Sequence, residues 1–275
     1  MLKDSEGTVD IDRDDFITSL GGAEAVARMD HEARADAIEE YRANQLEGAT
    51  AKPKGQTVAE VEAQIDTRGY RRGVGKLFIA EQGTVTRLPP MPARPTLIDF
   101  FERRFQSTQH VLQSASLAQR GGASEEVVLA CLLHDLGQSL MRTDHGWWSA
   151  QIFEPYVSER VTFAIRYHQA LRFYADPAAG YEYPELYYKL YGVDYEPPPH
   201  VAAAYETARR HPWYGDARLV TTNDLYAFDQ TTVVTLDPFV DLIGRRFKQP
   251  PEGLGNDNTP VAHMWRTLAT PDAPL

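Results

Sequence analysis

The sequence predicts an all-α fold, and three segments support that prediction. Residues 127–136 are apolar except for His134 and Asp135, and a helix that is apolar on all sides belongs in a protein core. Apolar residues also recur at helical spacing around His168 and around Asp224. We therefore expect several buried helices that carry a few polar residues among apolar neighbours.

The composition is that of a soluble globular protein. The 275 residues are 43% hydrophobic and 24% charged, and this length suits one large domain or a core with an appendage. The net charge of −11 argues against a nucleic-acid partner, which requires a basic surface. It is compatible with an anionic substrate that binds in a local basic pocket. No apolar run approaches the length of a membrane span, so we expect no membrane partner.

The cysteine content and the N-terminal segment indicate a cytoplasmic protein. Cys131 is the only cysteine, so no internal disulfide can form, and its apolar neighbours favour a buried thiol over a nucleophile. The segment before Leu20 has no twin arginine, and the helix that follows it carries charges where an export signal would be apolar.

The first 95 residues are predicted to form a mostly helical appendage and linker. Two short helices are expected, from Asp12 to Met29 and from Asp30 to Leu46. A third helix could follow over residues 57–67. Residues 69–95 are rich in glycine and proline and suit either a small hairpin or an irregular wrap over the core. The sequence leaves open whether the appendage covers the active site or mediates a homodimer.

Residues 96–248 are expected to form the catalytic core, followed by a C-terminal tail over residues 249–275. The first core helix is predicted over residues 96–120, and Ser124 caps the next one, which ends near Gly137. Further helices are expected around His145, after residue 158, and between residues 200 and 247. Within the tail we expect only a short helix near residues 263–268.

A tyrosine-rich segment interrupts the core helices. Residues 175–199 contain six tyrosines between prolines. They suit either a loop that is packed by its own rings or a lid over the site, in which tyrosine hydroxyls and Lys189 would contact the substrate.

The buried histidines and aspartates indicate a metal site. An adjacent imidazole and carboxylate in apolar surroundings are most simply stabilised by a metal ion, because an unpaired buried charge is costly. Six residues on successive helices have suitable neighbours and suit a site for two metals. Mixed imidazole and carboxylate ligation favours iron, manganese or zinc over calcium or magnesium. The candidate ligands, and hence the candidate catalytic residues, are His110, His134, Asp135, His145, His168 and Asp224.

The order of these residues resembles the HD-domain superfamily of all-helical metalloenzymes in its dinuclear form. The resemblance covers roughly residues 96–230 and implies an HD-domain helical bundle in which Asp135 bridges two metals. His110, His134 and Asp224 would complete one metal site, and His145 with His168 the other. Because Gly146 follows His145 in a short stretch, the site would hold one metal if His145 is not a ligand.

One branch of the superfamily resembles the segment from His145 to Tyr174 most. This branch is the mixed-valent diiron oxygenases, which include myo-inositol oxygenase and the enzymes that cleave hydroxylated aminophosphonates. The resemblance implies two iron ions, Fe(II) and Fe(III), as cofactors and dioxygen as a co-substrate.

Two further residues are candidates for binding the substrate. Arg172 lies four residues after His168, on the same helical face, and a guanidinium there can bind a carboxylate or phosphonate bidentately. The alternative is a salt bridge to an acid such as Glu159 or Asp176. Family members often carry lysine after the His-Asp-x-Gly motif. This chain has Gln138, which leaves a neutral hydrogen-bonding group there.

Two chemistries suit this site. The first is oxidative cleavage of a small, hydroxylated, anionic substrate by a diiron oxygenase, which the resemblance around residues 145–174 favours. The alternative is hydrolysis of a phosphate ester or nucleotide by two divalent metals such as manganese or zinc, although no lysine and arginine cluster suits a polyphosphate. A binding module without activity is disfavoured because all six ligand positions are occupied.

Overall fold

The computed structural model describes the greater part of the chain. The residues described are 13–29, 31–49, 56–57, 78–81, 84–87, 89–105, 108–141, 144–184, 187–189, 192 and 194–271. No helix in these segments is long and apolar enough to span a membrane.

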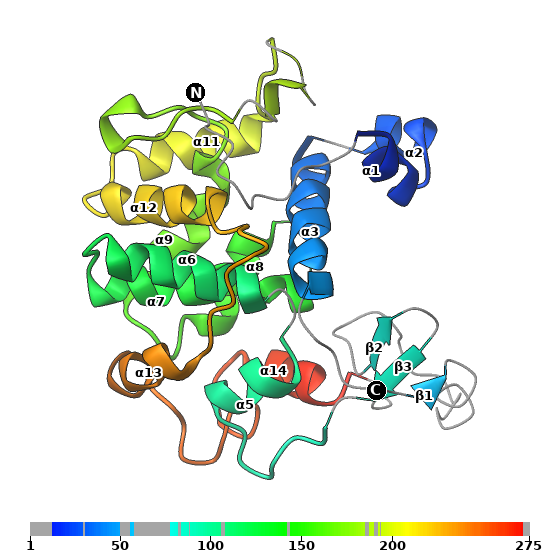
Figure 1. Cartoon of the computed structure of the whole chain (residues 1–275). Coiled ribbons are helices and arrows are strands. Elements are labelled where there is room, and N and C mark those ends of the chain that lie inside the picture. Colours follow the sequence, from blue (N-terminus) through cyan, green and yellow to red (C-terminus); the bar gives the residue numbers. More distant parts are fainter. Residues whose placement is uncertain are drawn as a thin grey trace.

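A bundle of helices packs side by side and forms the core of the fold, at the left in Figure 1. α9 contacts α7, α8 and α12, and α6 contacts α7 and α12. Residues such as Leu129, Leu132 and Ile165 are fully buried between them. The all-α prediction is therefore confirmed. The central helices are α6 (Thr108–Arg120), α7 (Glu125–Leu133), α8 (His145–Phe153), α9 (Glu159–Leu171) and α12 (Tyr214–Leu225).

Shorter elements surround this bundle. α14 lies beside α5 in Figure 1, and the fully buried Trp265 of α14 packs against Phe100 and Phe105 with ring centroids 4.7 Å and 6.1 Å away. The predicted tail thus contributes to the core. The shorter elements are α5 (Leu97–Arg103), α11 (Pro199–Ala208), α13 (Val240–Arg246), α14 (Ala262–Ala269) and the 3-10 helices η1 (Leu136–Ser139), η2 (Pro177–Ala179) and η3 (Asp237–Phe239).

The described residues of the N-terminal region form three helices and a small sheet. α3 (His31–Ala49) packs against α6, so a helix of the predicted appendage contacts the bundle. The strands β1 (Gln56–Thr57), β2 (Phe78–Glu81) and β3 (Thr84–Arg87) are antiparallel in the order β1-β3-β2, as in the hairpin alternative for residues 69–95. The helix considered for residues 57–67 lies outside the described residues, except for Thr57 in β1. The boundary at residue 95 stays a prediction.

Three predicted helices end elsewhere than expected. The first N-terminal helix is divided into α1 (Arg13–Ser19) and α2 (Ala23–Arg28), because Gly21 and Gly22 adopt φ values of 89° and 93° that no helix contains. The helix predicted over 96–120 is divided into α5 and α6. α5 ends at Arg103 and is followed by Arg104, whose buried guanidinium donates hydrogen bonds to the carbonyls of Pro89 and Ala269.

The third difference concerns the His-Asp doublet. Ser124 caps α7 as predicted, since its Oγ accepts a hydrogen bond from the Val127 N–H, but α7 ends at Leu133 and the doublet lies in the turn that leads to η1. Gly137 N–H donates to Ser149 Oγ of α8 at 2.8 Å, which draws this turn against α8.

Rings pack much of the tyrosine-rich segment. Tyr181 and Tyr187 are buried, and Tyr187 lies 6.1 Å from Phe173 between ring centroids. Tyr183 packs against Tyr187 with the ring centroids 5.6 Å apart. These contacts agree with the ring-packed loop. They also place Tyr187 at the cavity described below.

Candidate metal centre

The six candidate ligands come together at the ends of five segments. His110 lies in the first turn of α6 and His145 is the first residue of α8, whereas His168 and Asp224 lie in the last turns of α9 and α12. The doublet follows the last residue of α7. All six side chains are buried, so the bundle assembles a polar cluster inside its own core.

The distances divide the cluster into two groups that share one carboxylate. His110 Nε2 lies 3.0 Å from Asp224 Oδ1 and 3.3 Å from Asp135 Oδ2. On the other side of Asp135, its Oδ1 lies 3.1 Å from His145 Nε2 and 3.5 Å from His168 Nε2. In each group the nitrogen and oxygen atoms lie within 4.8 Å of one another, and the groups are His110, His134, Asp135 and Asp224, and Asp135, His145 and His168.

Backbone carbonyls orient three of the imidazole rings. The Nδ1 atoms of His110, His134 and His168 lie 3.1, 2.7 and 2.6 Å from the carbonyl oxygens of Ala227, Cys131 and Ile165. An Nδ1–H that donates to a carbonyl leaves the lone pair on Nε2. The three Nε2 atoms therefore face the centre as potential metal ligands.

The donor set fits a cation. The Nε2 atoms of all four histidines, Asp135 Oδ1 and Asp224 Oδ1 are buried and have no hydrogen-bond partner. Such atoms are costly to leave unsatisfied, and a metal ion satisfies them together. A metal ion at either group would be bound by several of these atoms at once, as buried transition-metal sites require.

Two histidine pKa shifts at the cluster, in opposite directions, bear on cation binding. Burial lowers the pKa of His110, but the carboxylates of Asp135 and Asp224, 3.3 and 3.0 Å from its Nε2, outweigh burial and raise it to about 10. The carboxylates therefore stabilise positive charge at this place, and metal ions compete with protons for such ligands. For His168, burial dominates and lowers the pKa to about 4, so its imidazole is neutral, as a ligand must be.

Gly146 explains why His145 can join the cluster. A Cβ at this position would lie 3.2 Å from both His168 Cε1 and the carbonyl oxygen of Ile165. The glycine after His145 thus permits the close approach of α8 to α9, and it does not interrupt the helix.

α3 adds two carboxylates that were not predicted from the sequence. Asp36 Oδ1 lies 3.4 Å from His145 Nδ1, and Glu39 Oε2 lies 3.7 Å from His145 Nε2. Both side chains are buried. Together with His145 they form a third group whose atoms could hold a metal ion.

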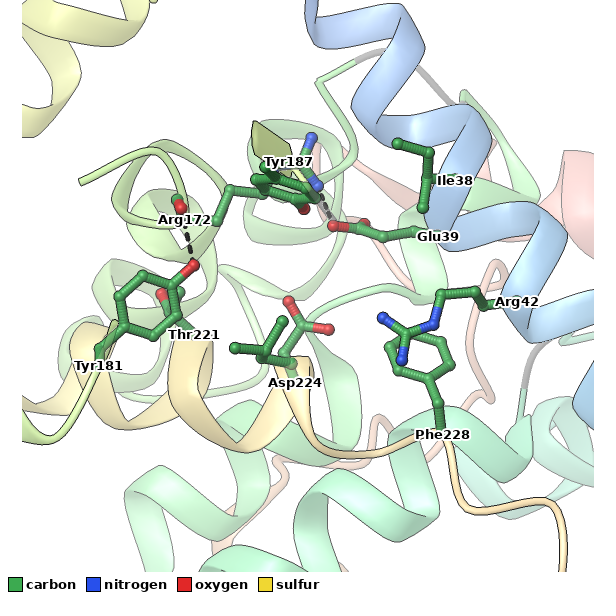
Figure 2. Close-up of a pocket in the computed structure, with 10 residues that line it drawn as sticks. Ile38, Glu39, Arg42, Arg172, Tyr181, Tyr187, Thr221, Asp224 and Phe228 are labelled. Atoms are coloured by element: carbon green, nitrogen blue, oxygen red, sulfur yellow. Dashed lines mark hydrogen bonds and ion pairs between the residues drawn. The ribbon is translucent and has the colours of Figure 1, made fainter. Parts of the chain in front are cut away.

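Arg172 lies between these two acids. Its Nη2 donates a hydrogen bond to Asp36 Oδ1 at 2.7 Å. Its Nη1 donates to Glu39 Oε1, as Figure 2 shows. The alternative predicted from the sequence was a salt bridge to an acid such as Glu159 or Asp176; the structure shows a salt bridge with two acids of α3 in their place. Arg172 therefore already has two carboxylate partners.

The two acids differ in their protonation behaviour. Burial raises the pKa of Glu39 to about 7; the charges of Asp224 and Asp135 act in the same direction, and that of Arg172 acts against it. For Asp36 burial also raises the pKa, but His145 and Arg172 outweigh it and lower the pKa below its usual value.

A small cavity adjoins the centre on the side of α3 (Figure 2). Its volume of about 10 Å³ suffices for the centre of one water molecule. Neither Gln138 nor Lys189 is among the described residues that line it. Gln138 is half-buried in η1, and Lys189 is exposed. The polar residues that line the cavity are Glu39, Arg42, Arg172, Tyr181, Tyr187, Thr221 and Asp224.

Comparison with known proteins gives one distant enzyme relative. No family model matches the chain. The [1-hydroxy-2-(trimethylamino)ethyl]phosphonate dioxygenase (glycine-betaine-forming) of Leisingera caerulea is 31% identical over 77 residues, which are 24% of this chain and 39% of that protein. The match thus spans about two fifths of the length of this relative. A distant relative is therefore an oxygenase of a phosphonate, and the helical fold and the buried His/Asp cluster are consistent with such an enzyme.

Proposed function

We propose that this protein is an HD-domain oxygenase that holds two iron ions and uses dioxygen to cleave a small, hydroxylated, anionic substrate. The observation that supports it most is the pair of ligand groups that share Asp135 in the core of the bundle. The similarity to a phosphonate dioxygenase favours oxygenation over other reactions of two-metal sites.

In this proposal each ligand group holds one iron. His110, His134 and Asp224 would hold the first, His145 and His168 the second, and Asp135 both. Two irons bound there would supply the redox chemistry that dioxygen requires and would act as Lewis acids toward the substrate hydroxyl.

The protein's own contribution is orientation and exclusion of water. The hydrogen bonds from Nδ1 of three histidines to backbone carbonyls fix the rings before a metal binds, so little reorganisation is needed. Each of the six ligand side chains is at most 6% exposed. A site this dry protects reactive species from side reactions with water.

The test is metal analysis, spectroscopy and oxygen uptake on protein purified without oxygen. We expect about two irons per chain, an EPR signal from a coupled Fe(II)/Fe(III) pair, and oxygen consumption when hydroxylated phosphonates or hydroxy acids are added. Zinc, manganese or a single metal, together with phosphatase turnover and no oxygen uptake, would show that the protein is a phosphohydrolase.

A further inference from the structure

Arg42 is a second arginine beside the candidate centre, and it reaches the centre from α3. Its guanidinium carbon lies 4.0 Å from the centroid of the Phe228 ring. That ring stacks on the His110 imidazole with centroids 4.3 Å apart. Figure 2 shows Arg42 above Phe228, with the Asp224 side chain facing it across the cavity. One aromatic ring therefore separates Arg42 from a candidate ligand.

The two arginines at the cavity differ in their partners. Arg172 has Asp36 and Glu39. Within the described part of the chain, Arg42 has no carboxylate at ion-pair distance and makes no hydrogen bond, and its Nε is buried without a partner. Burial lowers the pKa of the Arg42 guanidinium. A buried N–H without an oxygen partner, as at Arg42 Nε, is costly, and an anion in the cavity would provide that partner.

The net charge around the centre becomes positive once metals are bound, which favours binding of an anion. The buried carboxylates are Asp36, Glu39, Asp135 and Asp224, and two guanidiniums, Arg42 and Arg172, oppose them. These groups carry two net negative charges when all are ionised. An Fe(II)/Fe(III) pair carries five positive charges and exceeds that deficit by three, so an oxyanion such as a phosphonate or carboxylate group is attracted to the site.

We propose that Arg42 is the residue that binds the oxyanion group of the substrate, in the cavity between α3 and Asp224. This inference rests on the proposed function and names the contact for its anionic substrate. The planar guanidinium can donate two parallel hydrogen bonds to one oxyanion. Arg172, which the sequence suggested for this role, instead holds the two acids of α3 in place.

The size of the cavity sets a condition on binding. A phosphate group is larger than the single water molecule for which the cavity has space. Ile38, Glu39 and Tyr187 line the cavity together with Arg42. Entry of an oxyanion therefore requires α3 or the side chain of Tyr187 to move outward.

The test is calorimetric titration of the metal-loaded, full-length protein with inorganic phosphate. Loss of a charge-assisted pair of hydrogen bonds in Arg42→Gln should weaken phosphate binding by about 10- to 100-fold. Arg42→Lys keeps the charge without the planar fork and should show a smaller loss; it also serves if Arg42→Gln does not fold. Arg34→Gln is the matched control, because Arg34 lies on the same helix and donates to the carbonyls of Val26 and Ala27.

Three results would overturn the inference. These are phosphate affinity of Arg42→Gln within twofold of wild type, an equal loss in Arg34→Gln, and no measurable phosphate binding by the wild-type protein. Iron content and oxygen uptake of the wild-type protein are measured separately. If phosphate affinity does not depend on Arg42 but the protein holds two irons and consumes oxygen, only the inference about Arg42 is refuted. If phosphate affinity depends on Arg42 but no oxygen is consumed, only the proposed oxygenase function is refuted.

Discussion

Replacing Arg172 by methionine should destabilise the protein strongly. Arg172 is 2% exposed, and the side chains of Asp36 and Glu39 are 7% and 8% exposed, so solvent does not screen the loss. Removing one partner of a buried ion pair leaves an uncompensated charge and costs about 3–5 kcal/mol. The hydrogen bond from Tyr181 Oη to the Arg172 carbonyl does not involve the removed atoms.

Urea denaturation measures this effect, with thermal unfolding as a second readout. For a chain of this size the expected loss corresponds to a decrease in Tm of about 6–20 °C. Arg160→Met is the matched control. Arg160 pairs with Asp216 but its side chain is 42% exposed, so its removal should cost about 1 kcal/mol or less.

A second variant tests the cause. In Arg172→Met, further replacement of Asp36 by asparagine removes the carboxylate whose pKa lies below its usual value and should restore about 1–3 kcal/mol. The reasoning is refuted if Arg172→Met is no less stable than Arg160→Met, or if Asp36→Asn gives no rescue. Weaker phosphate binding with unchanged stability in Arg172→Met would favour the role in substrate binding.

Three further outcomes are expected. Asp135→Asn should reduce the bound metal to about one ion per chain or less, whereas the exposed His263→Gln should leave the metal content unchanged. Gly137→Ala would place a Cβ 2.5 Å from Ser149 Oγ and should lower the free energy of unfolding in urea by about 1–3 kcal/mol; a loss below about 0.5 kcal/mol would contradict the packing. The hydrogen bond from the Tyr214 hydroxyl lowers the pKa of Asp176 below its usual value of 3.8. Its contribution is therefore present above that pH and lost as the pH falls through the folded pKa, so the stability difference between wild type and Asp176→Asn should shrink below pH 3.8; a constant difference would refute it.

The bundle and the residues at its centre could be predicted from the sequence for one physical reason. His168 and Asp224, for example, have apolar residues at helical spacing around them in the sequence, so the polar residue stands out at a defined spacing. The break between α5 and α6 could not be predicted from the local sequence. At this break Arg104 donates hydrogen bonds to the carbonyls of Pro89 and Ala269, and Ala269 is far away in the sequence.

α3 shows why part of the site was missed. Its inward face carries Asp36, Glu39 and Arg42 beside Ala35 and Ile38. A face that mixes buried charges with alanine has no apolar stripe, so the helix resembles a solvated one. The spacing of the two acids and the arginine at i, i+3 and i+6 places all three on one face of the helix. The sequence of α3 alone does not show that this face meets Arg172 and the centre, because those residues are distant in the chain.

The contact between α5 and α14 also affects how the chain folds during synthesis. Phe100 and Phe105 pack against Trp265. The first core helix therefore cannot complete its packing until about 160 further residues have been synthesised. At ribosomal rates of roughly 5–20 residues per second, that wait lasts on the order of 10–30 s. During this interval the aromatic face of α5 is exposed on a growing chain, where it is a target for chaperones and a site for aggregation.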